Sequence, residues 1–351
     1  MKKTFIGQNE MCRDNCITVL EMVQRFGRLT RRQLEAELGM SWGGVTNVVN
    51  RLLSAGYLCE RKEEKNGSTG RTPGVLEING QDNFILGADV NDTGLSACMM
   101  NLKGEIISEH HAKADFTGKD ALLNSLLHFI QGVLNQYDRQ HILSVGISMQ
   151  GEVDEEGGVS LRLTQCPGWE KQQLREYLHQ HLGKEVLLAH DPDCMLLNYM
   201  ESRDSENVIL IRLDKSVGMA VALRGEILHG NGLWEIKQTQ LAGDGRARCL
   251  DDYVSACGVS GKLSEQALHE LAQPLAIAVG NACWLLRPDT LILCGDLMRH
   301  KNVFMDDFRA HLSKLWPNTD AMAILAETDA AAARKGAATL AMRHAVRQIE
   351  I

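Results

Sequence analysis

The first hydrophobic positions of the chain recur every three or four residues and predict two short helices. Thr30 and Gln33 form a capping-box pattern that starts the first helix, and Gly39 ends it. Ser41 caps the second helix, which ends at Gly56. One face of this second helix is apolar and is expected to be buried. The apolar stripe consists of Val45, Val48, Val49, Leu52 and Leu53.

The segments around these two helices complete a small domain. Helix 15–25 supplies the first helix, and Met1–Glu10 is expected to be a flexible arm. Tyr57–Lys62 and Gly74–Ile78 are predicted to pair as a hairpin around the polar tip Glu63–Arg71. Two helices joined by a glycine turn and followed by a hairpin indicate a winged helix-turn-helix over residues 1–80. A small helical bundle without DNA-binding function shows similar stripes and remains the alternative.

The pattern changes after the polar cluster Asn79–Asn83, which is the best candidate for a linker. Apolar strands then alternate with helices, of which 121–137 and 264–286 are the clearest. This alternation predicts an α/β body. The expected strands are 84–90, 95–101, 105–110, 142–149, 185–190, 208–213, 218–223 and 291–294.

Charge divides the chain in the same place. The net charge is −8 overall, but residues 1–80 hold 12 Lys/Arg against 9 Asp/Glu, and residues 81–351 hold 25 against 36. A basic head on an acidic body fits a head that meets nucleic acid. The ten cysteines are scattered without a CxxC, and no signal peptide or apolar run of membrane-spanning length occurs. We expect a reduced cytoplasmic location and no membrane partner.

A series of motifs runs along the chain in a fixed order. The head contains GMSWGGVTNVVNRLLSAGYL and GRTP. The body contains, in order, LGADVNDTG, GISMQGEVDEEGGV, CPGWEKQQL through LLAHDPD, GEILHGNGLWE, RPDTLILCGDL and DAAAARKGAATLA. These motifs and their order resemble the ROK family, which gathers sugar kinases and sugar-responsive repressors, and the head motifs resemble the DNA-binding head of the repressors. The resemblance implies an actin-like ATPase fold with two lobes, approximately 81–190 plus the C-terminal helix and 191–325. It also implies that residues 81–351 bind an effector and form a homodimer or a dimer of dimers.

Measured against the family's kinases, the phosphate loops are altered. The first loop, DxGGTK in the kinases, corresponds to residues 89–94; it keeps Asp89 and Thr93 but places Asp92 where the γ-phosphate would lie. The second loop keeps only Gly218 and adds Asp214. At an effective dielectric of about 20, a carboxylate 4 Å from a phosphate costs roughly 4 kcal/mol unless a cation intervenes. We therefore expect no ATP binding and no enzyme activity; the alternative is that these acids hold Mg²⁺.

The resemblance also locates an effector pocket. Asp191 matches the catalytic base of the kinases, although an aspartate there can equally cap the next helix. Trp169 matches a family tryptophan and is expected to be a core residue. Carboxylates and amides in a cleft suit the hydroxyls of a sugar. The expected ligand-binding residues are Gln165, His190, Asp191, Glu235, Gln238 and Asp251.

A family zinc site, His followed by CxCGxxGC, is not expected here. The corresponding positions are Gln238, Ala242, Asp244 and Cys249, which cannot form the tetrahedral nitrogen and sulfur site that zinc prefers. The pair Cys12 and Cys16 has helical spacing, with one member expected in the core. We expect no metal and no cofactor.

The recognition helix departs from the family's Ser-Lys-Ser-Thr-Val-Ser-Arg pattern. Asn47 can pair with adenine and Thr46 can contact a thymine methyl, while arginines and lysines contact phosphates. The exposed Trp42 can instead pack on the body or on a partner chain. The expected DNA-binding residues are Arg31, Arg32, Ser41, Trp42, Gly43, Thr46, Asn47, Asn50, Arg51, Lys65 and Arg71.

The sequence thus predicts a sugar-responsive transcriptional regulator, acting as a repressor of carbohydrate metabolism. Its partners would be operator DNA and a sugar or sugar phosphate effector. The alternatives are an ATP-dependent sugar kinase with an appended DNA-binding head, and a ligand-independent DNA-binding dimer with a vestigial pocket.

Overall fold

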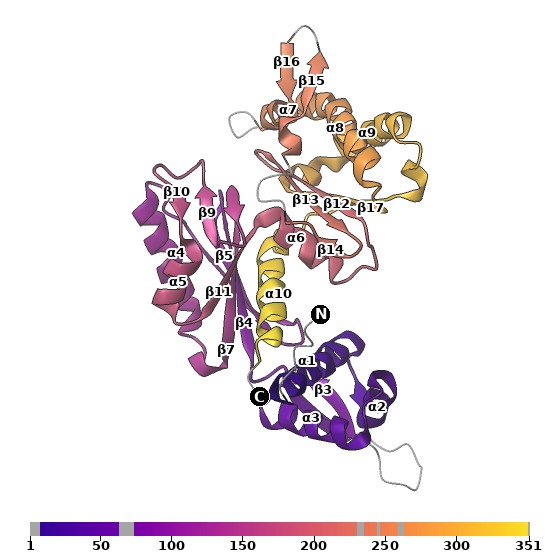
Figure 1. The fold of residues 1–351 in the computed structure, drawn as a ribbon. Helices are drawn as coiled ribbons and strands as arrows, with labels where there is room; N and C mark the ends of the chain where they lie inside the picture. Colours follow the sequence, from indigo (N-terminus) through magenta and orange to yellow (C-terminus); the bar gives the residue numbers. More distant parts are fainter. Residues whose placement is uncertain (1–7, 63–73, 230–234, 244–245, 259–262, 350–351) are drawn as a thin grey trace, which may run out of the picture.

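The computed structural model describes residues 8–62, 74–229, 235–243, 246–258 and 263–349. Figure 1 shows a small N-terminal head below a body of two lobes, with α10 running from the region between the lobes toward the head. Within the described ranges, no helix is long and apolar enough to cross a membrane. The elements of the head are α1 (Gln8–Phe26), β1 (Leu29–Thr30), α2 (Arg31–Leu38), α3 (Trp42–Ser54), β2 (Leu58–Lys62) and β3 (Gly74–Ile78).

Local signals determine where the helices of the head begin and end. Thr30 and Gln33 form the predicted capping box of α2, and Gly39 ends that helix in the left-handed conformation. The hydroxyl of Ser41 accepts a hydrogen bond from the Gly44 amide at the start of α3. Strands β2 and β3 pair antiparallel, as predicted, and β1 pairs with β3 to complete the sheet. The described head is a winged helix-turn-helix, although the predicted wing tip lies outside the described residues.

The start of the chain differs in part from the prediction. Helix α1 begins at Gln8, seven residues before the predicted start, so a flexible arm reaching Glu10 is wrong for residues 8–10. The rest of that arm lies outside the described residues. Cys16 is buried in the head core while Cys12 is only partly buried, which confirms that one of the two cysteines is a core residue.

The head shares its hydrophobic core with the body. Leu20 and Leu52 of the head belong to the same buried cluster as Ile85, Met100 and Val346. A guanidinium nitrogen of Arg13 donates to the carbonyl oxygen of Arg347 over 2.7 Å, and the Gln24 amide donates to the carbonyl oxygen of Leu102 over 3.2 Å. Head and first lobe therefore pack as one continuous unit in the described structure.

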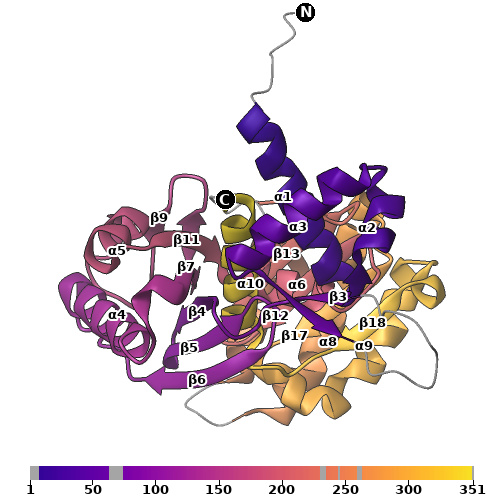
Figure 2. The same cartoon turned by 90° about the horizontal axis from the view of Figure 1, so that it is seen from below.

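The first lobe is a mixed sheet with the strand order β11-β7-β4-β5-β6. Strands β4, β7 and β11 run parallel, and β4, β5 and β6 are antiparallel neighbours. Helices α4 and α5 pack on one face of this sheet and α10 on the other (Figures 1 and 2). The bounds are β4 (Phe84–Asn91), β5 (Gly94–Asn101), β6 (Ile106–Ala112), α4 (Lys119–Leu134), β7 (Ile142–Met149), α5 (Leu174–Leu182), β11 (Glu185–His190) and α10 (Ala332–Arg347).

Two glycines of the central strands allow α10 to lie close to the sheet. A Cβ atom on Gly87 would collide with the carbonyl oxygen of Arg334, and one on Gly146 would collide with that of Ala337. Both carbonyls belong to α10. Glycine at these positions is therefore required by the close approach of backbone to backbone.

The second lobe is a sheet with the order β14-β13-β12-β17-β18. Helices α7, α8 and α9 cover one face, while α6 and the start of α10 pack on the other. Helices α6 and α10 also cross each other, so these two helices connect the lobes (Figure 1). The bounds are α6 (Asp191–Met200), β12 (Val208–Leu213), β13 (Val217–Leu223), β14 (Glu226–Ile227), α7 (Leu250–Cys257), α8 (Glu265–Leu286), β17 (Thr290–Cys294), α9 (Lys301–Leu315) and β18 (Ala323–Ala326).

Several short elements were not predicted. They form the antiparallel sheet β10-β9-β8 beside the first lobe and the hairpin of β15 and β16 on the second. Predicted strand 105–110 is β6, shifted by one or two residues, and helix 121–137 is α4, which ends three residues earlier. The short strands are β8 (Glu152–Asp154), β9 (Val159–Arg162), β10 (Glu170–Gln172), β15 (Gln240–Gly243) and β16 (Arg246–Cys249).

Candidate DNA-binding surface and effector cleft

The outer face of α3 is polar and open to solvent. Its apolar stripe lies in the core of the head, and half of the Trp42 side chain is exposed. The Thr46 hydroxyl is an exception, since its oxygen is buried without a hydrogen-bond partner among the described residues. The exposed residues of the predicted DNA-binding set on this helix and its cap are Ser41, Trp42, Gly43, Asn47, Asn50 and Arg51.

Arg31, a predicted phosphate contact, is engaged within the head. Its guanidinium group forms an ion pair with Glu60 of β2, with one nitrogen 3.1 Å from Oε2, and also reaches the Asn50 side chain at 3.5 Å. This pairing fixes α2 against the wing strand and neutralises the arginine. Arg32 is exposed and lies beside it, whereas Lys65 and Arg71 lie outside the described residues.

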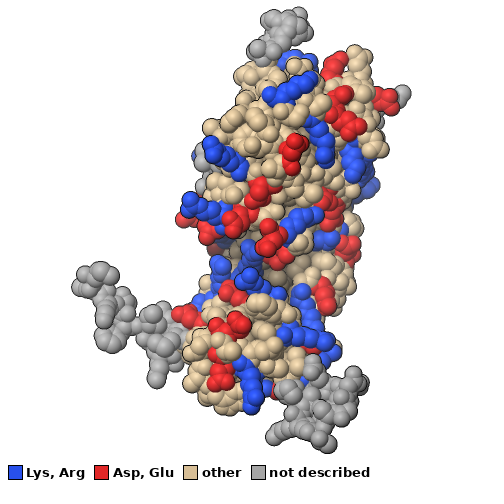
Figure 3. Space-filling model, turned by 90° about the vertical axis from the view of Figure 1, so that its right-hand side faces the viewer, with Lys and Arg blue, Asp and Glu red and all other residues tan. Residues whose placement is uncertain are grey.

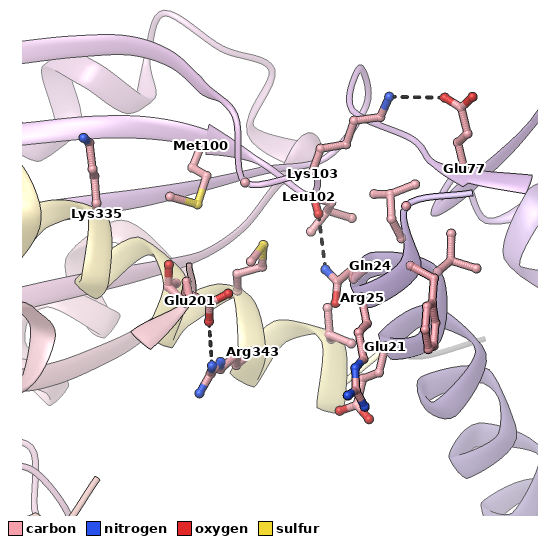
Figure 4. Close-up of a pocket in the computed structure, with 18 of the residues that line it drawn as sticks. Glu21, Gln24, Arg25, Glu77, Met100, Leu102, Lys103, Glu201, Lys335 and Arg343 are labelled. Atoms are coloured by element: carbon pink, nitrogen blue, oxygen red, sulfur yellow. Dashed lines mark hydrogen bonds and ion pairs between the residues drawn. The ribbon is translucent and has the colours of Figure 1, made fainter. Parts of the chain in front are cut away.

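A buried carboxylate joins the head to the body. Glu77 of β3 is 6 % exposed and lies 2.9 Å from Arg28, 3.7 Å from Arg61 and 3.5 Å from Lys103. Lys103 belongs to the turn between β5 and β6 of the body. Figure 4 shows Lys103 and Glu77 facing each other at a junction cavity of about 1280 Å³. The head is thus held by ion pairs as well as by its apolar core.

Away from this junction, charges of both signs are mixed. Figure 3 shows Lys/Arg and Asp/Glu side chains interspersed over the face of the body in view, with no extended field of one sign. The face of the body in this view therefore offers a polyanion no extended basic surface.

In the body, the two altered phosphate loops face each other. Asp92 lies in the turn between β4 and β5, and Lys215 lies in the turn between β12 and β13. The Lys215 ammonium is 2.6 Å from the Asp92 carboxylate, and this hydrogen bond raises the pKa of Lys215. The ion pair joins the two turns that correspond, by the family resemblance, to the phosphate loops of the kinases. Lys215 was not singled out from the sequence.

The buried carboxylates beside this cleft are also engaged. Asp89 accepts hydrogen bonds from Ser148 over 2.7 Å and from Asn91 over 2.6 Å, and burial raises its pKa. Asp191 is 2 % exposed and forms an ion pair with Arg212. Arg212 is shared with Asp214, which also accepts a hydrogen bond from the backbone amide of residue 296. Arg212 was likewise not singled out from the sequence; its partner Asp191 lies in another element, at the start of α6.

The predicted effector residues do not converge on one point. A small cavity of about 40 Å³ brings together His190 and Glu235, with Glu152, Gly218 and Lys237 among its other lining residues. Burial lowers the pKa of His190 to about 4, so its imidazole is neutral at neutral pH. Asp191 is adjacent in sequence but is not among the residues that line this cavity. Binding sites for small molecules usually measure roughly 300–1,000 Å³, so a sugar needs more space than this arrangement of the lobes provides.

Three further members of the predicted set lie apart. The Gln165 amide donates to Gln150, which also accepts from the Asp92 amide over 3.0 Å. Asp251 accepts hydrogen bonds from the Ser216 hydroxyl over 2.7 Å and from the backbone amide of residue 217 over 2.8 Å. These hydrogen bonds hold the β4–β5 turn and the β12–β13 turn in place. Gln238 is exposed in a short 3-10 helix.

The positions that correspond to the family zinc site lie on an ordinary hairpin. Strands β15 and β16 pair antiparallel, and Cys249 caps α7. Asp244 and the side chain of Ala242 lie outside what the structure describes. Trp169 is buried, and its indole nitrogen donates to the Ser160 hydroxyl over 2.8 Å, which confirms it as a core residue.

Comparison with known proteins identifies the fold. A crystal structure of a ROK family transcriptional regulator, described as a homologue of the Escherichia coli Mlc protein, covers 96 % of this chain and 97 % of its own at TM-score 0.80 and 18 % identity. A ROK family glucokinase from Streptomyces griseus, solved with glucose and AMPPNP, covers 74 % of this chain and 99 % of its own at TM-score 0.62 and 16 % identity. The protein is therefore a winged helix-turn-helix head on an actin-like, two-lobed sugar-kinase-like body.

Sequence comparison gives the family. The model of the ROK family matches residues 85–266, just over half of the chain, and the chain belongs to that family. The DNA-binding transcriptional repressor Mlc of Escherichia coli (strain K12) is 24 % identical over 270 residues, covering 74 % of this chain and 65 % of that protein. The xylose repressor of Caldicellulosiruptor bescii is 23 % identical over 273 residues, covering 74 % and 66 %. The chain thus spans slightly less than two thirds of the length of these relatives.

Proposed function

We propose that this protein is a sugar-responsive transcriptional regulator that acts as a repressor. The observation that carries the proposal is the exposed polar face of α3 on a head whose core continues into the sugar-kinase-like body. The N-terminal part of a recognition helix reads base edges in the major groove, and an exposed asparagine such as Asn47 suits adenine. The relatives Mlc and the xylose repressor carry repressor function in their names, which supports the same reading.

Helix α10 provides a physical route from effector to DNA. Its first half packs against both lobes, and its last turn contacts the head through Val346 and Arg347. A sugar that binds one lobe arrangement better than the other shifts the equilibrium between them. Because the head packs on α10 and the first lobe, such a shift changes the spacing of two heads in a dimer and hence the affinity for operator DNA.

The polar contacts of the cleft favour regulation over catalysis. Lys215 and Asp92 fill the phosphate position with an ion pair, and Arg212 neutralises the aspartate that corresponds to a kinase base. A general base must be free to accept a proton from the substrate hydroxyl. We infer that phosphoryl transfer has been lost, and that a sugar or sugar phosphate binds between the lobes in an arrangement more open than the described one, whose cavity measures about 40 Å³.

Footprinting on fragmented genomic DNA tests the proposal. We expect protection of a pseudo-palindromic site by the full chain, and loss of protection when the effector from a sugar and sugar phosphate panel is added. The double variant Asn47→Ala/Arg51→Ala is the matched control, since both side chains are exposed and the head core is unchanged. A complete lack of protected sites, with and without sugars, contradicts a regulatory function.

An ATP-dependent sugar kinase is the second candidate, supported by the retention of Asp89 and Asp191. A coupled assay over a hexose panel with Mg-ATP tests it. Turnover that disappears in Asp191→Asn, with the variant still folded, favours the kinase over the regulator. The remaining alternative is a DNA-binding dimer that has no effector. A saturable rise in melting temperature when a sugar alone is added would contradict that alternative.

A homodimer is part of the proposal. The largest exposed apolar side chains outside the head include Trp284 and Leu285 of α8 and Leu315 of α9. Trp284 and Leu315 are neighbours, because the indole nitrogen donates to the Leu315 carbonyl oxygen over 3.0 Å. An isologous contact of this edge with a second copy would bury the patch. Sedimentation of Leu285→Glu should give monomers, and a dimer that persists would place the interface elsewhere.

A further inference from the structure

Three side chains with metal-ligating atoms meet where the two lobes adjoin. Glu155 lies in the connection between β8 and β9 of the first lobe, Asp193 lies in the first turn of α6, and His229 follows β14 of the second lobe. One ligand atom from each lies within 4.8 Å of the other two. None of the three lines the small cavity that contains His190 and Glu235. The trio is also distinct from the cysteine positions of the family zinc site.

Asp193 supplies an independent indication that a ligand binds between these three side chains. The residue is 4 % exposed, and no group of the described residues donates a hydrogen bond to its Oδ1 atom. A buried carboxylate oxygen without a partner is costly, and a cation is the partner that compensates it most effectively. The neighbouring group is the carboxylate of Glu155. Two ionised carboxylates at this distance repel each other, so Glu155 alone makes the ionised form of Asp193 less favourable.

Glu155 and His229 are already oriented toward the centre of the trio. Oε1 of Glu155 accepts a hydrogen bond from the backbone amide of His190 over 2.7 Å, and this bond fixes the orientation of the carboxylate. The other oxygen, Oε2, pairs with Nδ1 of His229. The Glu155 side chain is 11 % exposed, whereas that of His229 is 53 % exposed. An ion can therefore enter from the side of the histidine and displace the imidazole proton from the Glu155 contact.

We propose that Glu155, Asp193 and His229 bind a divalent first-row transition ion that fastens the second lobe to the first. Two carboxylate oxygens and one imidazole nitrogen suit Zn²⁺, Mn²⁺ or Co²⁺, whereas Mg²⁺ and Ca²⁺ prefer ligand sets made of oxygen alone. Three protein ligands leave at least one position for water. Since the ligands come from both lobes, the ion favours the lobe arrangement in which all three meet.

Titration of the chelator-treated full chain with Co²⁺ tests this site. We expect saturable binding of one ion per chain, a visible ligand-field spectrum without a thiolate charge-transfer band, and a rise in melting temperature. Asp193→Asn and His229→Gln should each weaken the affinity by at least about tenfold, the scale on which even supporting contacts of metal sites act. Asp193→Asn should fold well without metal, because it removes one of two facing carboxylates.

The control is His269→Gln, which removes an exposed histidine that pairs with Asp307 at 3.4 Å on α9. Its Co²⁺ affinity should equal that of the unaltered chain. A thiolate charge-transfer band would assign the ion to cysteines and overturn the proposal. Unchanged affinity in folded Asp193→Asn, or no binding at all by the unaltered chain, would overturn it equally.

Discussion

The Nζ atom of Lys215 lies 2.6 Å from Oδ2 of Asp92, so an ion pair connects the β12–β13 turn of the second lobe with the β4–β5 turn of the first. Both turns correspond to phosphate loops in kinases of the family. The lysine side chain is 80 % exposed, so water and salt screen the pair. The pair therefore spans the two lobes at their surface.

A double-mutant cycle of Lys215→Ala and Asp92→Ala should give a coupling energy of roughly 0.2–1 kcal/mol, the range of exposed ion pairs. Urea denaturation at low and high salt measures it, and the coupling should fall as salt screens the charges. The two single variants provide the internal control. A coupling energy near zero at low salt would show that the lobes are not held by this contact.

Arg212→Met should destabilise the protein by about 3–5 kcal/mol, because it leaves the carboxylate of Asp191 buried without its cation. Arg299→Met is the matched control, since that arginine is 63 % exposed and pairs with Asp296 on the surface. Arg299→Met should lower the free energy of unfolding by no more than about 1 kcal/mol. Equal and small losses in the two variants would contradict the role of Arg212 inside the cleft.

Glu77→Gln should loosen the head from the body. The substitution removes the charge that Arg28, Arg61 and Lys103 share, and it should lower the free energy of unfolding by roughly 1.5–3 kcal/mol, as for hydrogen bonds to charged groups. Limited proteolysis across residues 79–83 should then proceed faster, while Glu206→Gln, an exposed glutamate, leaves the rate unchanged. If both variants are cleaved at the original rate, the apolar core alone holds the head.

Asn47 and Arg51 should affect DNA binding in different ways. Asn47→Ala should weaken binding to the footprinted site by about 1–3 kcal/mol and relax its sequence preference, because it removes a contact to a base edge. Arg51→Ala should weaken binding to all sequences and reduce the salt slope by about one. Fluorescence anisotropy against operator and unrelated duplexes at several salt concentrations separates these effects. The same loss on every duplex for Asn47→Ala would mean that another residue reads the bases.

Much of the secondary structure follows from local signals in the sequence. The Thr30 capping box, the Ser41 cap and the left-handed Gly39 appear where the pattern predicts them, since each satisfies the backbone groups of its own helix. Short strands such as β8 and β10 escaped prediction because three residues carry no measurable periodicity. Their pairing depends on partners elsewhere in the chain.

The cleft was less predictable than the fold. The family resemblance predicts Gln165 and Asp251 as effector ligands, and this stays a prediction. In the structure the Gln165 amide donates to Gln150, and Asp251 accepts a hydrogen bond from Ser216. Arg212 and Lys215 neutralise carboxylates that sequence reasoning treated as free. A charge of opposite sign on a distant segment leaves no local pattern, so these pairs become visible only when the chain is folded.

The position of the residues after α10 has a consequence for the autonomy of the head. Val346 and Ile349 are buried in the same cluster as Leu20 and Leu52, so segments from opposite ends of the described chain close one interior. A fragment of residues 1–80 lacks these apolar groups, and part of its core would face water. The free energy of unfolding of the head therefore depends on the body to which it is attached.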